Sequence, residues 1–129
     1  MGLLKKIFKK NVAEAQQAFI NWIRLTNIDQ IKQIRSLSKS ETVFIFKHST
    51  RCGISRMVMK QFEDDYDTSL NIDLFYLDLL RFRDVSNEIE SKFQISHESP
   101  QIIIIKNGIV VTQVSHGEIN NLELNRLVM

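Results

Sequence analysis

Short apolar runs alternate with amphipathic stretches along most of the chain. The runs with the length and composition of β-strands are residues 22–25, 42–47 and 72–78. Each is followed by a stretch in which apolar residues recur at helical spacing: one after Thr26, one from Cys52 to about Tyr66, and one after Asp84. Thr26 and Asp84 are the predicted N-caps of the first and last of these helices. This order of strands and helices predicts an α/β fold with parallel crossovers.

The end of the chain has a different pattern. Asn107-Gly108 lies between two apolar runs, residues 101–106 and 109–114. Asn-Gly at such a position favours a type I′ turn, so we expect a β-hairpin and an antiparallel strand pair. A last helix is predicted from about Glu118 to Val128. The whole pattern therefore predicts a central mixed sheet flanked by helices, with a C-terminal antiparallel hairpin and helix.

Composition limits the class of protein. The chain has 129 residues, of which 43% are hydrophobic and 25% charged, as in a single globular domain. The formal net charge of +2 gives no ground for a nucleic-acid partner. A single cysteine cannot form an internal disulfide, so nothing indicates an oxidising compartment. His48, His97 and His116 are far apart in sequence and lack metal-ligand spacing, so no metal site is predicted.

The N-terminal segment is basic. We assign residues 1–20 to a basic tail or N-terminal helix and residues 21–129 to the folded domain. Apolar residues between Leu3 and Phe8 fall on one helical face, which is compatible with weak attachment to a membrane surface. No stretch approaches the ~18 apolar residues that a membrane span needs, and no signal-peptide core is visible. We expect a cytoplasmic monomer with no stable membrane insertion.

Cys52 is the only cysteine, and it lies between a predicted strand and a predicted helix. We place it on the first turn of that helix, where unpaired N–H groups and the positive end of the helix dipole favour an anion. The thiolate is the nucleophilic form of cysteine. Arg51, the open backbone at Gly53 and the Ser55 hydroxyl are predicted to stabilise it. An isolated cysteine is more often a small buried hydrophobe, but these neighbours do not form an apolar pocket.

Pro100 is the only proline, and it opens the first strand of the predicted hairpin. One interpretation is an ordinary turn at the edge of a strand. The other is a cis Ser99–Pro100 peptide bond, which would place the Ser99 backbone beside the sulfur, free to pair with an extended substrate. The residues alone leave both interpretations open.

A resemblance to a known family favours the second interpretation. The order of elements, a cysteine at the start of a helix and a proline before the final hairpin resemble the thioredoxin fold over about residues 22–128. Within that fold, the segments Phe46–Ser55, Glu98–Pro100 and Ser115–Gly117 resemble the monothiol bacilliredoxins of the bacillithiol system. The shared pattern is Lys-His-Ser-Thr-x-Cys-x-Ile-Ser. Many members carry proline where this chain has Gly53.

The resemblance implies a thiol–disulfide oxidoreductase. Cys52 would remove bacillithiol, or a similar low-molecular-weight thiol, from mixed disulfides on S-thiolated client proteins. Because position 55 is serine, a second thiol molecule or a partner redoxin would regenerate Cys52. No bound cofactor is implied, since the small thiol is a co-substrate. The implied supporting residues are, for the thiolate, Arg51, Gly53, Ile54 and Ser55, and, for the substrate, His48, Thr50, Ser99, Pro100 and Gly117.

Three alternatives remain open. Cys52-Gly53-Ile54-Ser55 is similar to the Cys-Gly-Phe-Ser of monothiol glutaredoxins, which hold a shared iron–sulfur cluster with glutathione, although their Trp-Pro and Gly-Gly-x-Asp features are missing. The same run is similar to the loop of glutaredoxin-linked arsenate reductases, but Ser99 stands where those enzymes carry a second arginine. The third alternative is a non-enzymatic stress or interaction module. The sequence also leaves the identity of the small thiol open.

Overall fold

The computed structural model describes residues 20–70 and 72–128, so almost all of the predicted N-terminal tail lies outside the described part. The described residues form one sheet with the strand order β1-β3-β2-β4-β5. Its strands are β1 (Ile23–Arg24), β2 (Thr42–His48), β3 (Ile72–Asp78), β4 (Gln101–Lys106) and β5 (Ile109–Ser115). The helices are α2 (Asp29–Leu37), α3 (Gly53–Asp65), α4 (Arg83–Phe93), the 3₁₀ helix η1 (His116–Asn121) and α5 (Leu124–Val128).

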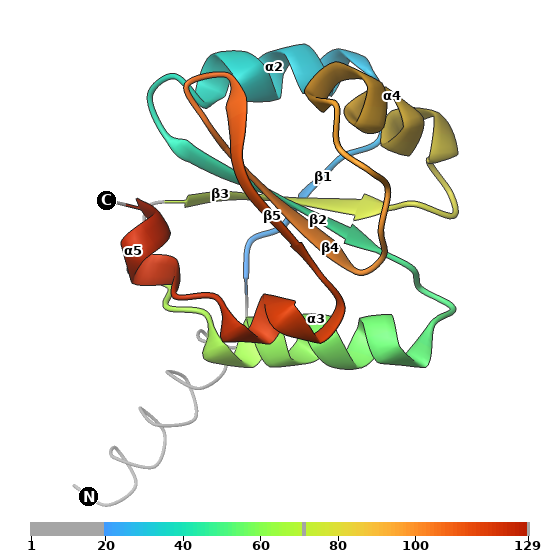
Figure 1. Cartoon of the computed structure of the whole chain (residues 1–129), viewed down its shortest axis with the longest axis vertical. Coiled ribbons are helices and arrows are strands. Elements are labelled where there is room, and N and C mark those ends of the chain that lie inside the picture. Colours follow the sequence, from blue (N-terminus) through green and yellow to red (C-terminus); the bar gives the residue numbers. More distant parts are fainter. Residues whose placement is uncertain (1–19, 71, 129) are drawn as a thin grey trace, which may run out of the picture.

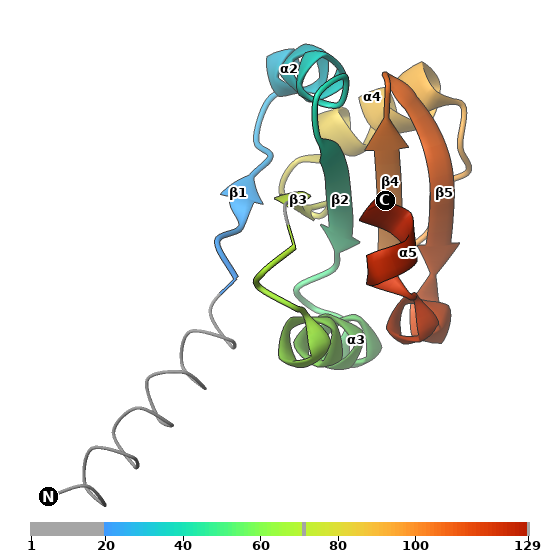
Figure 2. The same ribbon diagram turned by 90° about the vertical axis from the view of Figure 1, so that its left-hand side faces the viewer.

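The sheet is mixed and forms the middle of three layers. β1, β3 and β2 are parallel, whereas β4 runs antiparallel to β2 and β5 antiparallel to β4. Helices α2 and α4 cover one face, and α3 with η1 covers the other (Figures 1 and 2). The predicted α/β class, the parallel crossovers and the C-terminal hairpin are therefore confirmed.

Two apolar clusters, one on each face, hold these layers together. Along β2, Val43 and Ile45 face α2 and α4, while Phe44 and Phe46 face α3, because successive strand side chains point to opposite faces. All four are fully buried. Burying one such side chain stabilises the fold by about 1.5–3 kcal/mol. A strand covered on both faces is apolar at most positions, which explains the unbroken hydrophobic runs Val43–Phe46 in β2 and Ile102–Ile105 in β4.

The hairpin turn has the predicted geometry. Asn107 and Gly108 both adopt positive φ, 54° and 79°, as a type I′ turn requires. The turn is also fastened to the end of α2, because the Asn107 N–H donates to the Ser38 carbonyl at 2.7 Å and the Gly108 N–H to the Ser38 hydroxyl at 2.9 Å.

Two predicted N-caps are wrong. At α2, the Gln30 N–H donates to the Asn27 side-chain oxygen, while the Gln30 side chain accepts from the N–H groups of Thr26 and Asn27. The N-cap position is Ile28, whose side chain makes no cap, so Asn27 just before it takes the capping role expected of Thr26 through this reciprocal pair of hydrogen bonds. At α4, the helix already begins at Arg83, so Asp84 lies within its first turn, where its negative charge still suits the helix dipole.

The predicted last helix is also wrong as a single element. The chain forms η1, becomes extended at Leu122, and only then forms the short helix α5. Tertiary packing explains the break: the Ile119 side chain is buried in the cluster under α3, and the Asn120 side chain donates to the Val58 carbonyl of α3 at 3.2 Å. A tight 3₁₀ turn places both residues against α3, and this requirement overrides the helical periodicity of the segment.

Candidate functional site

Cys52 ends the tight turn between β2 and α3. Its N–H donates to the Ser49 carbonyl at 3.2 Å, and its carbonyl accepts the Arg56 N–H at 3.1 Å. The residue is extended, with φ −98° and ψ 121°, and half-buried. It is therefore the N-cap of α3 rather than a residue of the first turn. An N-cap side chain lies next to the unpaired N–H groups at the start of its helix, so the electrostatic argument for a thiolate keeps its geometric basis.

Ser55 and His48 form a buried polar pair behind this turn. The Ser55 oxygen lies 2.8 Å from His48 Nδ1 and accepts the Ser49 N–H at 3.2 Å. His48, predicted to line the approach to Cys52, is only 5% exposed, and Ser55, predicted to stabilise the thiolate, is fully buried, so this pair lies in the protein interior. Burial lowers the pKa of His48; Asp78 opposes this effect and Arg56 adds to it. A neutral imidazole bonded to Ser55 thus fixes the end of β2 to the start of α3.

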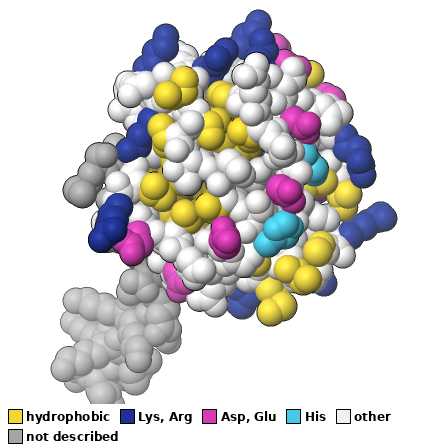
Figure 3. All heavy atoms as spheres, in the orientation of Figure 1, with side chains coloured by type: hydrophobic (Ala, Val, Ile, Leu, Met, Phe, Trp, Pro, Cys, Tyr) yellow, Lys and Arg dark blue, Asp and Glu magenta, His cyan; other side chains and the backbone are white. Residues whose placement is uncertain are grey.

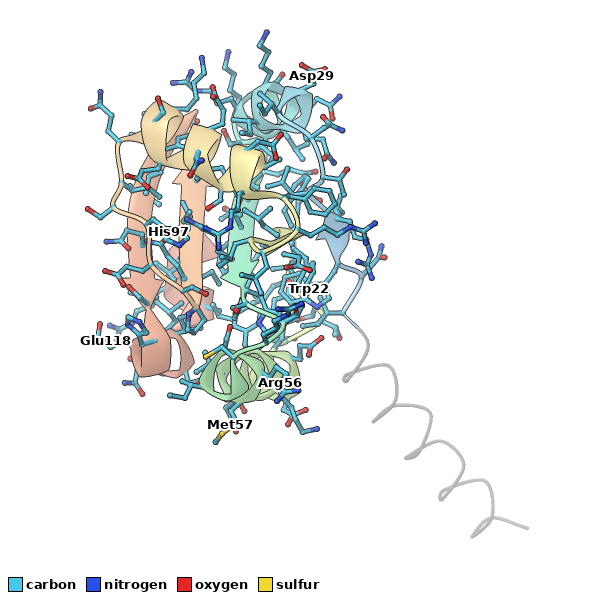
Figure 4. The ribbon with its side chains drawn as sticks, turned by 90° about the vertical axis from the view of Figure 1, so that its right-hand side faces the viewer. Trp22, Asp29, Arg56, Met57, His97 and Glu118 are labelled. Carbon is cyan, nitrogen blue, oxygen red and sulfur yellow. The ribbon has the colours of Figure 1, made fainter. Side chains whose placement is uncertain are left out.

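The side chains around the turn on the solvent side are both basic and apolar. Thr50, Arg51 and Gly53 are exposed, and an added Cβ at Gly53 would meet nothing within 4 Å. Ile54 and Met57 are 64% and 73% exposed, and Figure 4 shows Met57 projecting from α3 away from the sheet. The thiol therefore stands between a polar loop and an apolar patch, which Figure 3 shows over the start of α3.

The register of the sheet brings the other predicted residues to the same edge. Lys47 at the end of β2 pairs with Gln101 at the start of β4, and Gln101 pairs with Ser115 at the end of β5. Cys52 follows β2, Pro100 precedes β4 and Gly117 follows β5, so all three lie at the same edge of the sheet, beside three adjacent strands.

The Ser99–Pro100 connection has the expected geometry. The Ser99–Pro100 peptide bond is cis, Pro100 is buried, and the Pro100 carbonyl accepts the His116 N–H at 2.9 Å. The Ser99 hydroxyl oxygen is buried with no hydrogen-bond partner among the described residues. Gly117 is exposed, and an added Cβ there would meet nothing within 4 Å, so the space beside it is open.

Lys47 makes a second polar contact at this edge that the sequence analysis did not assign. Its side chain is fully buried, and Nζ donates to His97 Nδ1 at 2.6 Å. His97, labelled in Figure 4, lies on the connection between α4 and β4 that also carries Ser99. Burial lowers the pKa of Lys47 to about 8, against the opposing effect of Glu90 and Glu98. The available signal was the alternation in β2, because position 47 shares the face of Val43 and Ile45.

Within the described residues, no group of three or more His, Cys, Asp and Glu side chains is arranged to hold a metal ion. No helix in that part of the chain is long and apolar enough to cross a membrane.

Comparisons with known proteins show the family and the fold of the chain. The model of the monothiol bacilliredoxin BrxC family matches residues 23–124. A solved structure described as a candidate oxidoreductase with a thioredoxin fold is 36% identical, covering 81% of this chain and 91% of that chain with a TM-score of 0.69. Thioredoxin from Malassezia sympodialis is 22% identical (79% and 84% covered, TM-score 0.60), and mitochondrial thioredoxin 3 from Saccharomyces cerevisiae 18% (84% and 95%, TM-score 0.63). The last two show the fold alone, which is the thioredoxin fold.

Proposed function

Because the chain belongs to the monothiol bacilliredoxin BrxC family, we propose that Cys52 removes bacillithiol from mixed disulfides on client proteins. The family and the fold support the broader assignment to thiol redox chemistry. The observation that carries the proposal is the position of Cys52. It is the half-buried N-cap of α3, at the sheet edge where the Ser99–Pro100 connection and Gly117 also lie.

In the proposed reaction, the Cys52 thiolate attacks the bacillithiol sulfur of a client mixed disulfide. The new S–S bond joins Cys52 to bacillithiol, the old bond breaks, and the electron pair leaves with the client sulfur as a thiolate. A second bacillithiol thiolate, or a partner redoxin, then attacks the bacillithiol sulfur on Cys52. This step releases the Cys52 thiolate and leaves the bacillithiol in a disulfide with the attacking thiol. Position 55 is serine, so Cys52 supplies the one thiol at the helix start.

The residues beside Cys52 serve the thiolate in this scheme. The backbone N–H groups at Gly53, Ile54 and Ser55 begin α3 and face the side of the N-cap, where they favour a negative sulfur. Arg51 adds positive charge from the exposed side. The Ser55 hydroxyl acts indirectly, since its contact with His48 holds the first turn of the helix in place.

The neighbouring loops serve the substrate. We assign to the Ser99 backbone the pairing with an extended mixed disulfide, while Pro100 closes the buried side of that connection. Thr50 and the open space at Gly117 border the path of the small thiol. His48 is buried and contributes through Ser55 rather than by contact with substrate.

Mass spectrometry of exchange with a bacillithiolated client peptide tests the proposal. The wild-type protein should gain one bacillithiol on Cys52 as the free peptide appears. Cys52→Ser should do neither, whereas Ser49→Ala, which removes a neighbouring hydroxyl, should behave as wild type. Peptide release by Cys52→Ser at the wild-type rate would contradict the proposal.

Two further measurements separate the alternatives. An absorption spectrum of anaerobically purified protein with visible cluster bands would favour iron–sulfur binding, as in monothiol glutaredoxins. A client complex that survives Cys52→Ser unchanged, without any thiol exchange in the wild type, would favour a non-enzymatic interaction module.

A further inference from the structure

A hollow opens beside the Cys52 turn, between the β2–α3 and β3–α4 connections. Its volume is about 430 Å³, and its lining residues are Thr50, Arg51, Asp78, Leu80, Arg81 and Arg83. The two connections lie side by side at one end of the sheet, at the right-hand edge of Figure 1. Pockets that enclose small molecules begin at roughly 300 Å³, so the hollow suits a small molecule rather than a protein segment.

Positive charge dominates this hollow. Three arginines, Arg51, Arg81 and Arg83, line it, and in the described part of the chain none of them forms an ion pair within 4 Å. The one acidic lining residue is Asp78, whose Oδ1 accepts the Leu80 N–H at 3.2 Å. Figure 3 shows Lys and Arg side chains gathered along this edge of the molecule. The hollow thus has more positive than negative charge to offer a ligand.

Ion pairing within the fold does not explain the positions of these arginines. Arg83 is the first residue of α4, where a cation opposes the helix dipole. The Arg81 guanidinium lies over the Phe82 ring, 5.5 Å from its centroid, so its position is restrained without a carboxylate partner. Guanidinium groups bind carboxylates in a bidentate fork, and an unpaired set of them beside a hollow is suited to that task.

We propose that this hollow binds the carboxylate end of the small thiol during exchange at Cys52. Thr50 and Arg51 immediately precede Cys52, so a small thiol in disulfide linkage with that residue stands next to the hollow. The site thereby selects low-molecular-weight thiols that carry carboxylates over neutral or cationic ones. This inference rests on the proposed function, and it adds Arg81 and Arg83 as specificity-determining residues.

Exchange rates with a series of mixed disulfides test the selection. One client peptide is blocked in turn with bacillithiol or glutathione, which carry carboxylates, with neutral 2-mercaptoethanol, and with cationic cysteamine. The double variant Arg81→Gln/Arg83→Gln should exchange the first two at least tenfold more slowly, while its rate with 2-mercaptoethanol changes less than twofold. Arg35→Gln on α2 is the matched control and should leave all rates unchanged. An unequal loss between bacillithiol and glutathione identifies which carboxylate-bearing thiol the hollow fits.

A binding measurement keeps this inference separate from the reaction itself. Titration of the wild-type protein with succinate, a dicarboxylate without sulfur, should shift the side-chain N–H signals of Arg81 and Arg83 and the backbone N–H signals of Thr50 and Leu80 in NMR spectra. The backbone shifts should vanish in the double variant. No exchange with any peptide would end the proposed function, and the succinate arm would then decide on the hollow alone. Equal slowing with glutathione and 2-mercaptoethanol, or arginine signals that ignore succinate, would overturn the hollow as a carboxylate site.

Discussion

Lys47 and His48 are adjacent in the sequence, yet their side chains serve opposite faces of the sheet. His48 faces α3 and pairs with Ser55 at 2.8 Å, whereas Lys47 faces α4 and pairs with His97 at 2.6 Å. Both side chains are buried. Each pair joins the end of β2 to a loop that borders Cys52: the first to the start of α3, the second to the connection that carries Ser99.

The two pairs differ in their electrostatic cost. His48 and Ser55 meet as neutral groups, and burial simply keeps the imidazole uncharged by lowering its pKa. Lys47 instead brings an ammonium group out of water, and its pKa falls to about 8 because burial disfavours the charge. The hydrogen bond on one face of this edge buries no charge, whereas the contact on the other face requires a cation to lose its hydration, which is unfavourable. A costly group of this kind is a candidate for a positioning role rather than for stability.

Truncating Lys47 should lower the free energy of unfolding more than any other change at these two pairs. Lys47→Ala leaves a cavity under the connection and removes the donor to His97, so we expect a loss of about 2–5 kcal/mol in the free energy of unfolding. Lys47→Met keeps most of the volume without the charge and should cost less than about 1.5 kcal/mol. Denaturant unfolding of both variants measures the difference. Equal losses would show that the charge, and not the packed stem, supports the fold.

Removing the hydroxyl of Ser55 tests the other face. Ser55→Ala leaves His48 Nδ1 and the Ser49 N–H without their partner, and an unsatisfied buried group costs about 1–3 kcal/mol. Ser49→Ala is the matched control, because Ser49 contributes its backbone to this contact and should change stability by less than about 0.5 kcal/mol. Thermal or denaturant unfolding gives both values. If the two variants were equally stable, the buried pair would not fix the start of α3.

Raising the pH should change the free energy of unfolding least, because it acts only through the charge of Lys47. The pKa of Lys47 is about 8 in the folded protein against 10.5 for an ordinary lysine. Between these values the unfolded chain binds more protons than the folded one, so the contribution of Lys47 to stability rises with pH. Relative to Lys47→Met, the wild-type protein should gain on the order of 1 kcal/mol between pH 8 and pH 9. Unfolding curves of both proteins across this range measure the gain. A constant difference would mean that Lys47 keeps its ordinary proton affinity when folded.

The parts of the fold that could be predicted are those with local or periodic signals. The strands β2 and β3, the helices that follow them, and the Asn107–Gly108 turn were all expected at nearly the observed positions. The errors have two causes: a distant contact overrides the local signal, or a neighbouring side chain takes over the expected role. Packing of Ile119 against the α3 cluster divides the last helix, and the side chains of Asn27 and Gln30 replace Thr26 at the start of α2.

Residue type and spacing along the chain were enough to establish the order of elements and the place of Cys52 at a helix start. They also carried the resemblance of the chain to a family of single-cysteine redox proteins. Only the tertiary structure decided which groups meet. Strand register sets Lys47 beside the connection from α4, alternation turns His48 inward to Ser55, and two loops close around a hollow lined by arginines. The physical reason is that burial and charge at a site are set by residues from separate strands and helices, and no local pattern of one segment encodes its neighbours.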